Sequence, residues 1–280
     1  MNIAAALTTA TEKLHAAGIA EPRREASSLL EFVLRQNSAY LIAHSDDQLA
    51  ANQKMIFDAC VRRRAKREPL QYITGRTEFW RLEFELTPDV LIPRPETEIL
   101  VEAAILFLQS SDNPRFCEIG VGSGCIAVSI LHSLQNATAV ASDVSPAALQ
   151  IAACNAVKHG VDERLDLREA DLFEGIDERF DLIVSNPPYV PDDDIDGLQP
   201  DVRDFEPRSA LAGGADGLDI VRLIVEDSSQ FLCPGGVLLV EIGHDQAKRV
   251  AKFFGKDVWQ EVEFLRDLQN IDRVGRASLK

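Results

Sequence analysis

The strongest constraint on the fold is the alternation of apolar, strand-like runs with helical segments that begins near Asn113. Runs at 116–119, 138–142, 165–168 and 180–184 are short and strand-like, and the run at 180–184 is mostly apolar and β-branched, as expected of a central strand buried on both faces of a sheet. Helical patterns separate them, so the strands are predicted to lie parallel and to be joined by right-handed crossovers. The chain is therefore predicted to contain an α/β domain.

Three further runs complete a predicted sheet of seven strands. One spans 237–242, and the last two, at about 258–266 and 273–279, are expected to form an antiparallel hairpin at the sheet edge. Residues 190–217 form a long stretch rich in Asp, Pro and Gly. A loop of this length in a compact domain is usually functional or disordered, and here it is expected to be a lid that grips the substrate.

The region before the sheet has a different character. Residues 1–68 carry apolar side chains at helical spacing and no catalytic constellation, so a small helical bundle is predicted. Its role is either a structural cap or, as we expect, docking of a substrate protein. Apolar and polar residues alternate within 72–86, which predicts a β-hairpin. The predicted division is a bundle at 1–68, a hairpin linker at 69–92 and a catalytic domain at 93–280.

Two basic features stand out in these regions. The run RRRAKR at 62–67 is the one basic cluster, and a solvated helix end favoured by the helix dipole is the preferred interpretation. Contact with RNA or with an acidic patch is the alternative. Arg94 lies between Pro93 and Pro95; the start of a helix explains the prolines and the acids that follow, but not this arginine.

The strand at 180–184 leads directly into Asn186-Pro187-Pro188-Tyr189. The two prolines lack an N–H and cannot continue a sheet ladder, and Pro187 pushes Asn186 toward extended geometry. An amide side chain and stiff backbone carbonyls are therefore expected at the carboxyl end of a strand. In open α/β sheets this edge is where ligands bind.

This corner suits the capture of a planar –NH2 group. Asn186 Oδ1 and the Pro187 carbonyl are two acceptors that can hold both hydrogens and stabilise positive charge as the nitrogen reacts, and Tyr189 offers a flat face. An amide nitrogen is a weak nucleophile, so it also needs a very good leaving group such as a sulfonium. A proline-rich turn with no catalytic role is the alternative, because Asn-Pro pairs also mark turns.

A cofactor site is predicted on the preceding strands. The glycine-rich loop follows the strand at 116–119 and comprises Gly120, Val121, Gly122, Ser123 and Gly124. Such a loop lets a ligand approach the backbone at a helix N-terminus. A dinucleotide fingerprint would place glycine or alanine at position 125, where this chain has Cys125, so another adenosine cofactor is favoured over NAD. Asp143 ends the next strand and can accept from both ribose hydroxyls.

Asp171 and Leu172 follow the third strand. The carboxylate could accept from an exocyclic amine while Leu172 packs against a purine face. A loop acid beside a core phenylalanine, Phe173, is the alternative. Because parallel strands end at one edge, these residues, the glycine loop and the Asn186 corner are all expected to line the same rim of the sheet.

Charge and composition exclude several classes of protein. The net charge is −16, from 45 acids and 29 bases, whereas a dedicated nucleic-acid binder is normally basic. The five cysteines form no CxxC pair, which indicates free thiols in a reducing compartment, and no metal site is predicted. The first twenty residues lack a signal-peptide core and no apolar run approaches membrane-spanning length. A cytoplasmic protein without membrane attachment is expected.

The motifs together resemble those of class I S-adenosylmethionine-dependent methyltransferases: EIGVGSG at 118–124, the acid Asp143, and NPPY at 186–189. Within that class the chain resembles the release factor glutamine methyltransferases, the PrmC/HemK family. The segments that carry this second resemblance are EPLQYITGRTEFW at 68–80, LIPRPETEILVE at 91–102, FEPRSAL at 205–211 and GADGLDIVR at 214–222.

The resemblance implies a Rossmann-like, seven-stranded, mostly parallel sheet with a small N-terminal helical domain. It also implies transfer of a methyl group from S-adenosyl-L-methionine to the side-chain amide nitrogen (N5) of the glutamine in the Gly-Gly-Gln motif of class I peptide chain release factors. By position, the loop 120–124 would contact the methionine part of the cofactor, Asp143 the ribose, and Asp171 and Leu172 the adenine. Some relatives have an aromatic residue in place of Leu172, so stacking is expected to be weaker here.

At the acceptor end, the resemblance implies that Asn186, also adjacent to the cofactor, holds the glutamine amide together with Pro187, with Pro188 and Tyr189 packing nearby. The runner-up activity is amino-group methylation of nucleic-acid adenine (N6) or cytosine, with the same corner acting on a flipped base. The acidic net charge opposes it, and no stable nucleic-acid binding is expected. A catalytically silent binding protein is the third possibility.

Overall fold

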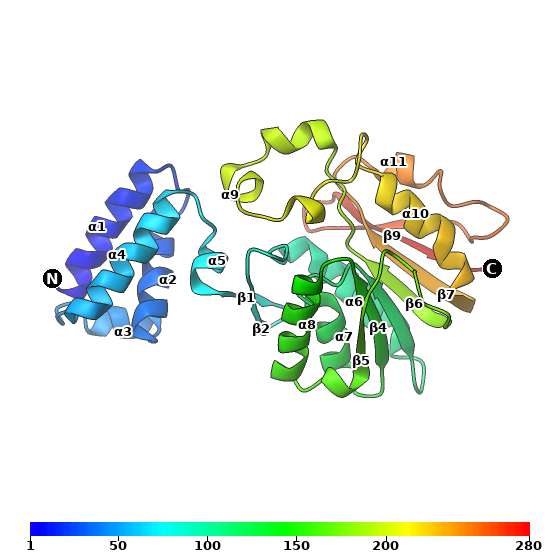
Figure 1. Cartoon of the computed structure of the whole chain (residues 1–280), viewed down its shortest axis with the longest axis horizontal. Helices are drawn as coiled ribbons and strands as arrows, with labels where there is room; N and C mark the ends of the chain where they lie inside the picture. Colours follow the sequence, from blue (N-terminus) through cyan, green and yellow to red (C-terminus); the bar gives the residue numbers. More distant parts are fainter. The chain divides into compact units, whose positions relative to one another are not determined.

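The computed structural model describes residues 1–280, which fold as two compact units (Figure 1). The first unit consists of residues 1–76 together with 199–205, and the second of 77–198 together with 206–280. The chain therefore leaves the second unit after residue 198, contributes a short segment to the first, and returns at residue 206. Where the functional domains begin and end along the chain stays a prediction.

Helices build the first unit, which confirms the predicted helical bundle. They are α1 (Ile3–Ala16), α2 (Pro22–Leu34), α3 (Ser38–Ala43), α4 (Ala51–Ala65), α5 (Leu70–Thr74) and, from the later segment, α9 (Pro200–Arg203). The Asn2 side chain caps α1, and Pro22 begins α2, where its missing N–H costs no helical hydrogen bond. The apolar helix faces enclose a core that includes Leu14, Leu29 and Phe57.

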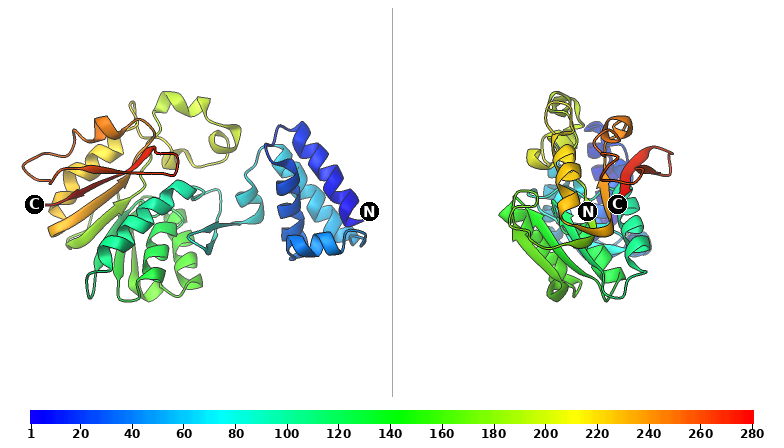
Figure 2. Two further views of the ribbon diagram at one scale, coloured as in Figure 1. Left: turned by 180° about the vertical axis from the view of Figure 1, so that it is seen from behind. Right: turned by 90° about the vertical axis from the view of Figure 1, so that its right-hand side faces the viewer.

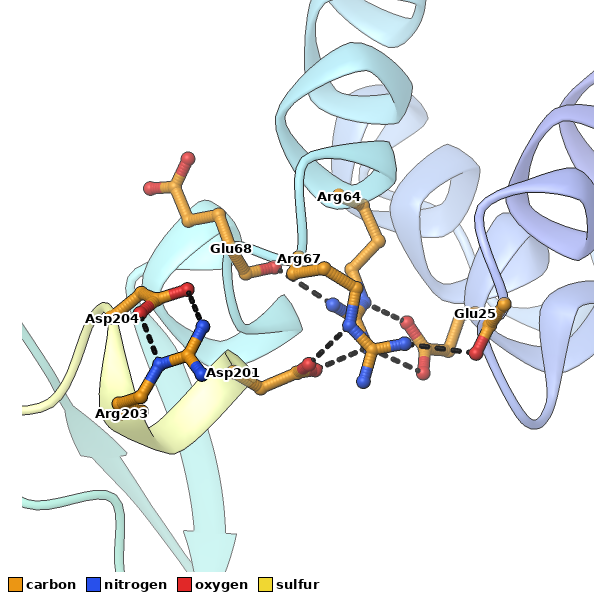
Figure 3. A network of polar contacts seen from close by, with 8 residues as sticks. Glu25, Arg64, Arg67, Glu68, Asp201, Arg203 and Asp204 are labelled. Carbon is orange, nitrogen blue, oxygen red and sulfur yellow. Dashed lines mark hydrogen bonds and ion pairs between the residues drawn. The ribbon is translucent and has the colours of Figure 1, made fainter. Parts of the chain in front are cut away.

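Part of the basic run lies inside this unit rather than on a solvated helix end (Figure 3). The Arg64 side chain is only 7% exposed; it pairs with Glu25 and, at 2.8 Å, with Asp201 of α9. Arg67 pairs with the same aspartate at 2.6 Å. Buried charges persist when they are paired, so these contacts hold the segment 199–205 to the bundle. The expectation of a solvated helix end is wrong for Arg64, because acids distant in the sequence cover it.

The second unit contains the predicted seven-stranded sheet. Its strands are β3 (Arg115–Ile119), β4 (Thr138–Asp143), β5 (Leu165–Glu169), β6 (Phe180–Ser185), β7 (Leu232–Glu241), β8 (Glu263–Arg266) and β9 (Asp272–Ser278). Their order is β5-β4-β3-β6-β7-β9-β8. The first five are parallel, while β9 runs antiparallel to both β7 and β8. The predicted α/β fold, with its antiparallel pair at one edge, is confirmed.

Helices cover both faces of this sheet (Figures 1 and 2). On one face α6 (Glu98–Leu108), α7 (Cys125–Ser133) and α8 (Pro146–Lys158) pack over a core that includes Phe116 and Leu182. On the other face α10 (Asp219–Asp227) and α11 (Ala247–Val250) pack over a core that includes Cys117 and Ile183. Successive strand residues thus enter opposite cores, which explains why the central strands are mostly apolar on both faces.

A two-stranded sheet of β1 (Arg76–Phe79) and β2 (Leu82–Glu85) precedes the large sheet. Its turn residues Trp80 and Arg81 have φ of +52° and +61°, which is unusual for side chains of this size. The backbone N–H of Trp80 donates to the Glu98 carboxylate at 2.8 Å, and Asn155 of α8 exchanges hydrogen bonds with the backbone of Glu85. These contacts fix the hairpin on the second unit's helices.

Two segments differ from the sequence-based expectation. The sequence pattern over about 245–255 predicts a helix, but α11 is a single turn at Ala247–Val250 followed by turn residues at 251–253. The stretch 190–217 is less irregular than expected, since it contains the short helices η3 (Asp192–Gly197), α9 and η4 (Arg208–Ala210). None of the helices is both long and apolar enough to cross a bilayer.

Candidate active site

A pocket of about 210 Å³ opens at the carboxyl ends of the parallel strands in the second unit. Its walls come from the loops after β3, β4, β5 and β6, from the loop before α6, and from the segment around η4. Predicted site residues that line it are Gly120, Val121, Gly122, Ser123, Asp143, Asp171, Leu172, Asn186, Pro187 and Pro188. Gly124 and Tyr189 are not among the lining residues.

The glycine loop is held in shape by backbone geometry that other residues rarely adopt. Gly120, Gly122 and Gly124 have φ of +77°, +52° and +79°, and a Cβ at Gly124 would stand 3.2 Å from Ala152 of α8. Gly124 thus serves close helix packing, while the preceding residues face the pocket. The loop ends at the N-terminus of α7, whose unpaired N–H groups attract negative charge.

Asp143 ties this loop to the next one. Its Oδ2 accepts from the Gly122 N–H and its Oδ1 from the Ser145 N–H, both at 2.9 Å. Ser145 itself caps α8 by accepting from Ala148, so the helix does not depend on the aspartate for its cap. A carboxylate has about four acceptor positions, so both oxygens of Asp143 retain capacity for a diol in the pocket.

The adenine end of the predicted site has a strained backbone. Leu172 lines the pocket with φ of +51°, and its carbonyl accepts from the Ser142 hydroxyl at 2.9 Å. A positive φ is costly for a branched side chain and persists only where the surroundings enforce it. Ser142 supplies that restraint and holds the Asp171–Leu172 corner against the pocket.

Glu118 is a pocket residue that the sequence analysis did not assign to the site. It is 1% exposed, its Oε2 accepts from the Ala127 N–H at 2.8 Å, and its Oε1 is buried without a hydrogen-bond partner. Burial raises the pKa of this carboxyl well above its usual range. A buried acceptor that faces a cavity calls for a cationic or donating ligand group. The signal in the sequence was the acid that directly precedes the glycine loop.

Asn186 is oriented by a second residue that the sequence analysis passed over, Thr97 of η1 (Pro95–Thr97). Asn186 Nδ2 donates to Thr97 Oγ1 at 3.1 Å, so its Oδ1 is not engaged by this contact. Thr97 is 1% exposed, and the carboxylate of Glu241, at the end of β7, is buried with its Oε2 lacking a hydrogen-bond partner. The Tyr189 hydroxyl approaches the same carboxylate at 3.5 Å, which places this side chain behind the pocket wall.

Arg94, left unexplained by the sequence, now has a partner. Its guanidinium forms a 2.6 Å ion pair with Glu206, whose side chain is 1% exposed. Glu206 directly precedes Pro207, Ser209 and Ala210, which line the pocket. The ion pair therefore ties the loop that carries Thr97 to the pocket wall formed by the segment around η4.

Two regions of the chain match known protein families. Residues 5–75 match the family described as PrmC N-terminal domain, and residues 97–198 match the methyltransferase small domain. The release factor glutamine methyltransferase of Geobacter sulfurreducens is 45% identical over 258 residues, which cover 92% of this chain and 89% of that protein. The protein of the same name from Cereibacter sphaeroides is 42% identical over 279 residues, covering 100% and 99%.

Solved structures resemble the fold at lower identity. The hMettl16 catalytic domain, in complex with an RNA hairpin, superposes with a TM-score of 0.58 at 15% identity and covers 87% of this chain and 92% of that one. The T. thermophilus rRNA methyltransferase RsmC, in complex with AdoMet and guanosine, gives a TM-score of 0.54 at 17% identity, covering 73% and 50%. At this identity the likeness concerns the fold alone.

Proposed function

This chain belongs to the release factor glutamine methyltransferase family, and we propose that it transfers a methyl group from S-adenosyl-L-methionine to the amide nitrogen (N5) of the glutamine in the Gly-Gly-Gln motif of class I peptide chain release factors. The observation that carries the site assignment is the Asn186–Thr97 hydrogen bond. It leaves the amide oxygen of Asn186 as an acceptor at the rim of a pocket that also contains the glycine loop.

The residues present fit the cofactor. The unpaired Glu118 Oε1 matches the ammonium of the methionine part, the α7 N-terminus its carboxylate, Asp143 the ribose hydroxyls, and Asp171 with Leu172 the adenine. When bound, S-adenosyl-L-methionine supplies a methyl group on a positively charged sulfur, which makes even a weak nucleophile reactive. The protein's own contribution is to orient the acceptor nitrogen toward that methyl group.

The acceptor amide is held by two oxygens. Asn186 Oδ1 and the Pro187 carbonyl accept its two N–H hydrogens and stabilise the positive charge that grows on the nitrogen as it reacts. Pro188 closes this part of the wall. No histidine or lysine lines the pocket, so no dedicated base acts before transfer, and the proton leaves to solvent afterwards. Tyr189 supports the corner from behind.

The net charge of the chain favours a protein substrate over the alternative activity, amino-group methylation of nucleic-acid bases. The net charge of −16 opposes the phosphate backbone of RNA or DNA, although the fold is shared with RNA methyltransferases. An acidic protein is instead suited to a basic protein partner. We therefore propose that release factors are the partners, that nucleic acid is not stably bound, and that the protein acts in the cytoplasm, where translation terminates.

The test is incubation of the purified protein with a release factor and isotope-labelled S-adenosyl-L-methionine, followed by peptide mass spectrometry. We expect one methyl group, on the glutamine of the Gly-Gly-Gln tripeptide. A release factor with that glutamine changed to alanine should gain none. Methyl transfer to a panel of RNA and DNA acceptors, with none to the release factor, would favour the runner-up; failure to bind the cofactor would favour a silent binding protein.

A further inference from the structure

We propose that Gln246 is a positioning residue for methyl transfer, whose buried amide anchors the backbone that follows the two prolines and so fixes the acceptor carbonyl of Pro187. The inference rests on the proposed function, because it concerns the corner that would hold the substrate amide. Gln246 lies just before α11, is not among the residues that line the pocket, and belongs to none of the motifs assigned to the site.

The backbone of the NPPY corner has few anchors of its own. The pairing of β6 with its neighbours β3 and β7 ends at Ser185. Pro187 and Pro188 have no N–H, so neither can donate a hydrogen bond that would hold this backbone in place. The position of the corner therefore depends on the strand before it and on the contacts of the residues that follow the second proline.

Gln246 supplies such a contact directly after the prolines. Its Nε2 donates to the Tyr189 carbonyl at 2.9 Å and to the Gly217 carbonyl at 3.3 Å. Its Oε1 accepts from the Gly243 N–H at 2.8 Å. Gln246 is 3% exposed, so water does not compete for these hydrogen bonds. One buried amide thus joins the NPPY corner to the loop before α10 and to the loop after β7.

The loop before α10 packs closely against the same backbone. The Val190 carbonyl accepts from the Gly213 N–H at 2.9 Å. A Cβ on Gly217 would collide with the Tyr189 carbonyl and would stand 3.0 Å from Gln246 Nε2. Glycine at position 217 therefore allows the loop to approach the anchored carbonyl, and the backbone after the prolines is held by both the loop and Gln246.

The anchor can act on the substrate because the chain between the two carbonyls is stiff. The Pro188 ring holds its φ at about −65° and also restricts the ψ of Pro187, so few rotations are free between the Pro187 and Tyr189 carbonyls. Without the anchor, the Pro187 carbonyl could turn away from the second N–H of the substrate amide. A misplacement of about 1 Å at a reacting centre can lower a rate by about 100-fold.

Gln246→Met tests the anchor in the full-length protein with a release factor as substrate. Methionine fills a similar volume but cannot donate to the Tyr189 carbonyl. We expect kcat to fall by roughly 10- to 100-fold, while the KM for the release factor and the Kd for S-adenosyl-L-homocysteine stay near their wild-type values. Gln260→Met, at an exposed position between α11 and β8, is the matched control and should keep the wild-type kcat.

Gln246→Glu separates hydrogen bonding from space filling. An ionised carboxylate can only accept, so it would face the Tyr189 and Gly217 carbonyls without a hydrogen to offer, whereas the protonated acid can donate to one of them. Burial raises the pKa of such a carboxyl. The ratio of the kcat of this variant to that of the wild type should therefore rise several-fold as the pH falls from about 8 to about 6. The same ratio for Gln246→Met should stay constant.

Comparison with the wild type at each pH removes the effect of other titrating groups, because they are the same in every variant. The charged groups around position 246 are Glu241 of β7, Asp216 in the loop before α10 with its partner Arg249 at 3.7 Å, and the exposed pair His244–Asp245 at 3.0 Å. A change in the ratio therefore reports the protonation of the introduced carboxyl.

Hydrogen exchange measures the anchor without an acceptor protein. The Gly243 N–H donates to Gln246 Oε1, so it should exchange faster in Gln246→Met than in the wild type. The Val190 N–H, directly after the anchored carbonyl, donates to the Leu211 carbonyl at 2.9 Å and should also exchange faster. The Leu239 N–H, within β7, should exchange at the same rate in both proteins.

The possible outcomes are distinguishable. Absence of methyl transfer by the wild type would refute the proposed function, and the exchange rates would then decide the anchor alone. Transfer by the wild type with an unchanged kcat in Gln246→Met would overturn the positioning role. A kcat ratio for Gln246→Glu that does not rise on acidification, or unchanged exchange at Gly243 and Val190, would also overturn it. So would a parallel loss of cofactor affinity in Gln246→Met, because it would show general damage to the fold.

Discussion

Arg94 and Glu206 lie 112 positions apart in the chain, and their side chains form an ion pair with 2.6 Å between Nη2 and Oε1. One belongs to the loop that precedes α6 and the other to the segment that returns from the first unit. Since the residues next to both line the pocket, this single contact joins two of its walls. The segments LIPRPETE and FEPRSAL, distant in the sequence, are thus one structural feature.

Arg94→Ala removes the cationic partner of a carboxylate whose side chain is 1% exposed. We expect the free energy of unfolding in urea to fall by about 1–3 kcal/mol, below the 3–5 kcal/mol of a fully buried pair because the Arg94 side chain is 32% exposed. Arg24→Ala is the control: its pair with Glu21 is exposed, so its loss should be within about 0.5 kcal/mol. Equal losses of unfolding free energy in the two variants would show that the Arg94–Glu206 pair stabilises the protein no more than an exposed ion pair does.

Glu118→Gln tests the fit of the cofactor. The variant keeps an acceptor for the Ala127 N–H but loses the charge. Binding should weaken by roughly 10- to 100-fold, equivalent to the 1.5–3 kcal/mol of a charged hydrogen bond. S-adenosyl-L-methionine and S-adenosyl-L-homocysteine share the ammonium, so calorimetry should give the same loss for both. A loss confined to the first ligand would place Glu118 at the sulfonium instead.

Glu241 should make stability depend on pH. Burial raises the pKa of Glu241 from 4.5 to about 7, so the folded state holds this proton more tightly than the unfolded state. The resulting contribution to the free energy of unfolding is fully present below pH 4.5 and is lost as the pH rises to about 7. Glu241→Gln has no proton to lose, so the variant lacks this pH dependence. The free energy of unfolding of the variant minus that of the wild type should therefore increase by on the order of 3 kcal/mol between pH 4.5 and 7. A difference that stays constant over this range would contradict the raised pKa.

Asp201→Asn tests how the segment 199–205 is held in the first unit. The change weakens the ion pairs to Arg64 and Arg67, of which Arg64 is nearly buried. Cleavage by a protease within 192–205 should become faster than in the wild type, because local opening becomes less costly. Asp204→Asn, whose partner is the neighbouring exposed Arg203, should leave the cleavage rate unchanged.

Much of this fold could be predicted from the sequence because the signals were local. The strand at 116–119 and its neighbours are buried on both faces, so their apolar character is continuous and easy to recognise. The length of the single-turn helix α11 was harder to predict. Its residues are compatible with a longer helix, and packing against the sheet decides where the turn ends.

The site residues show the same difference between local sequence signals and contacts that only the fold creates. Asp143 ends β4 and Asn186 directly follows β6, so their place at the sheet edge could be predicted. Thr97 and Glu241 could not be assigned, since the contact of Thr97 with Asn186 and the burial of Glu241 both depend on elements far apart in the chain. Glu241 in particular looks like an ordinary end of a strand until its burial is known.

The most direct test of the capture of an amide by the NPPY corner is single-turnover methyl transfer by Asn186→Ala, with a release factor and saturating cofactor. We expect the rate to fall by about 10²–10³, the effect of removing one preorganised polar group, while the cofactor Kd changes little. Asn52→Ala, at an exposed position of α4, should match the wild type. A rate for Asn186→Ala close to that of the wild type would contradict the proposed role.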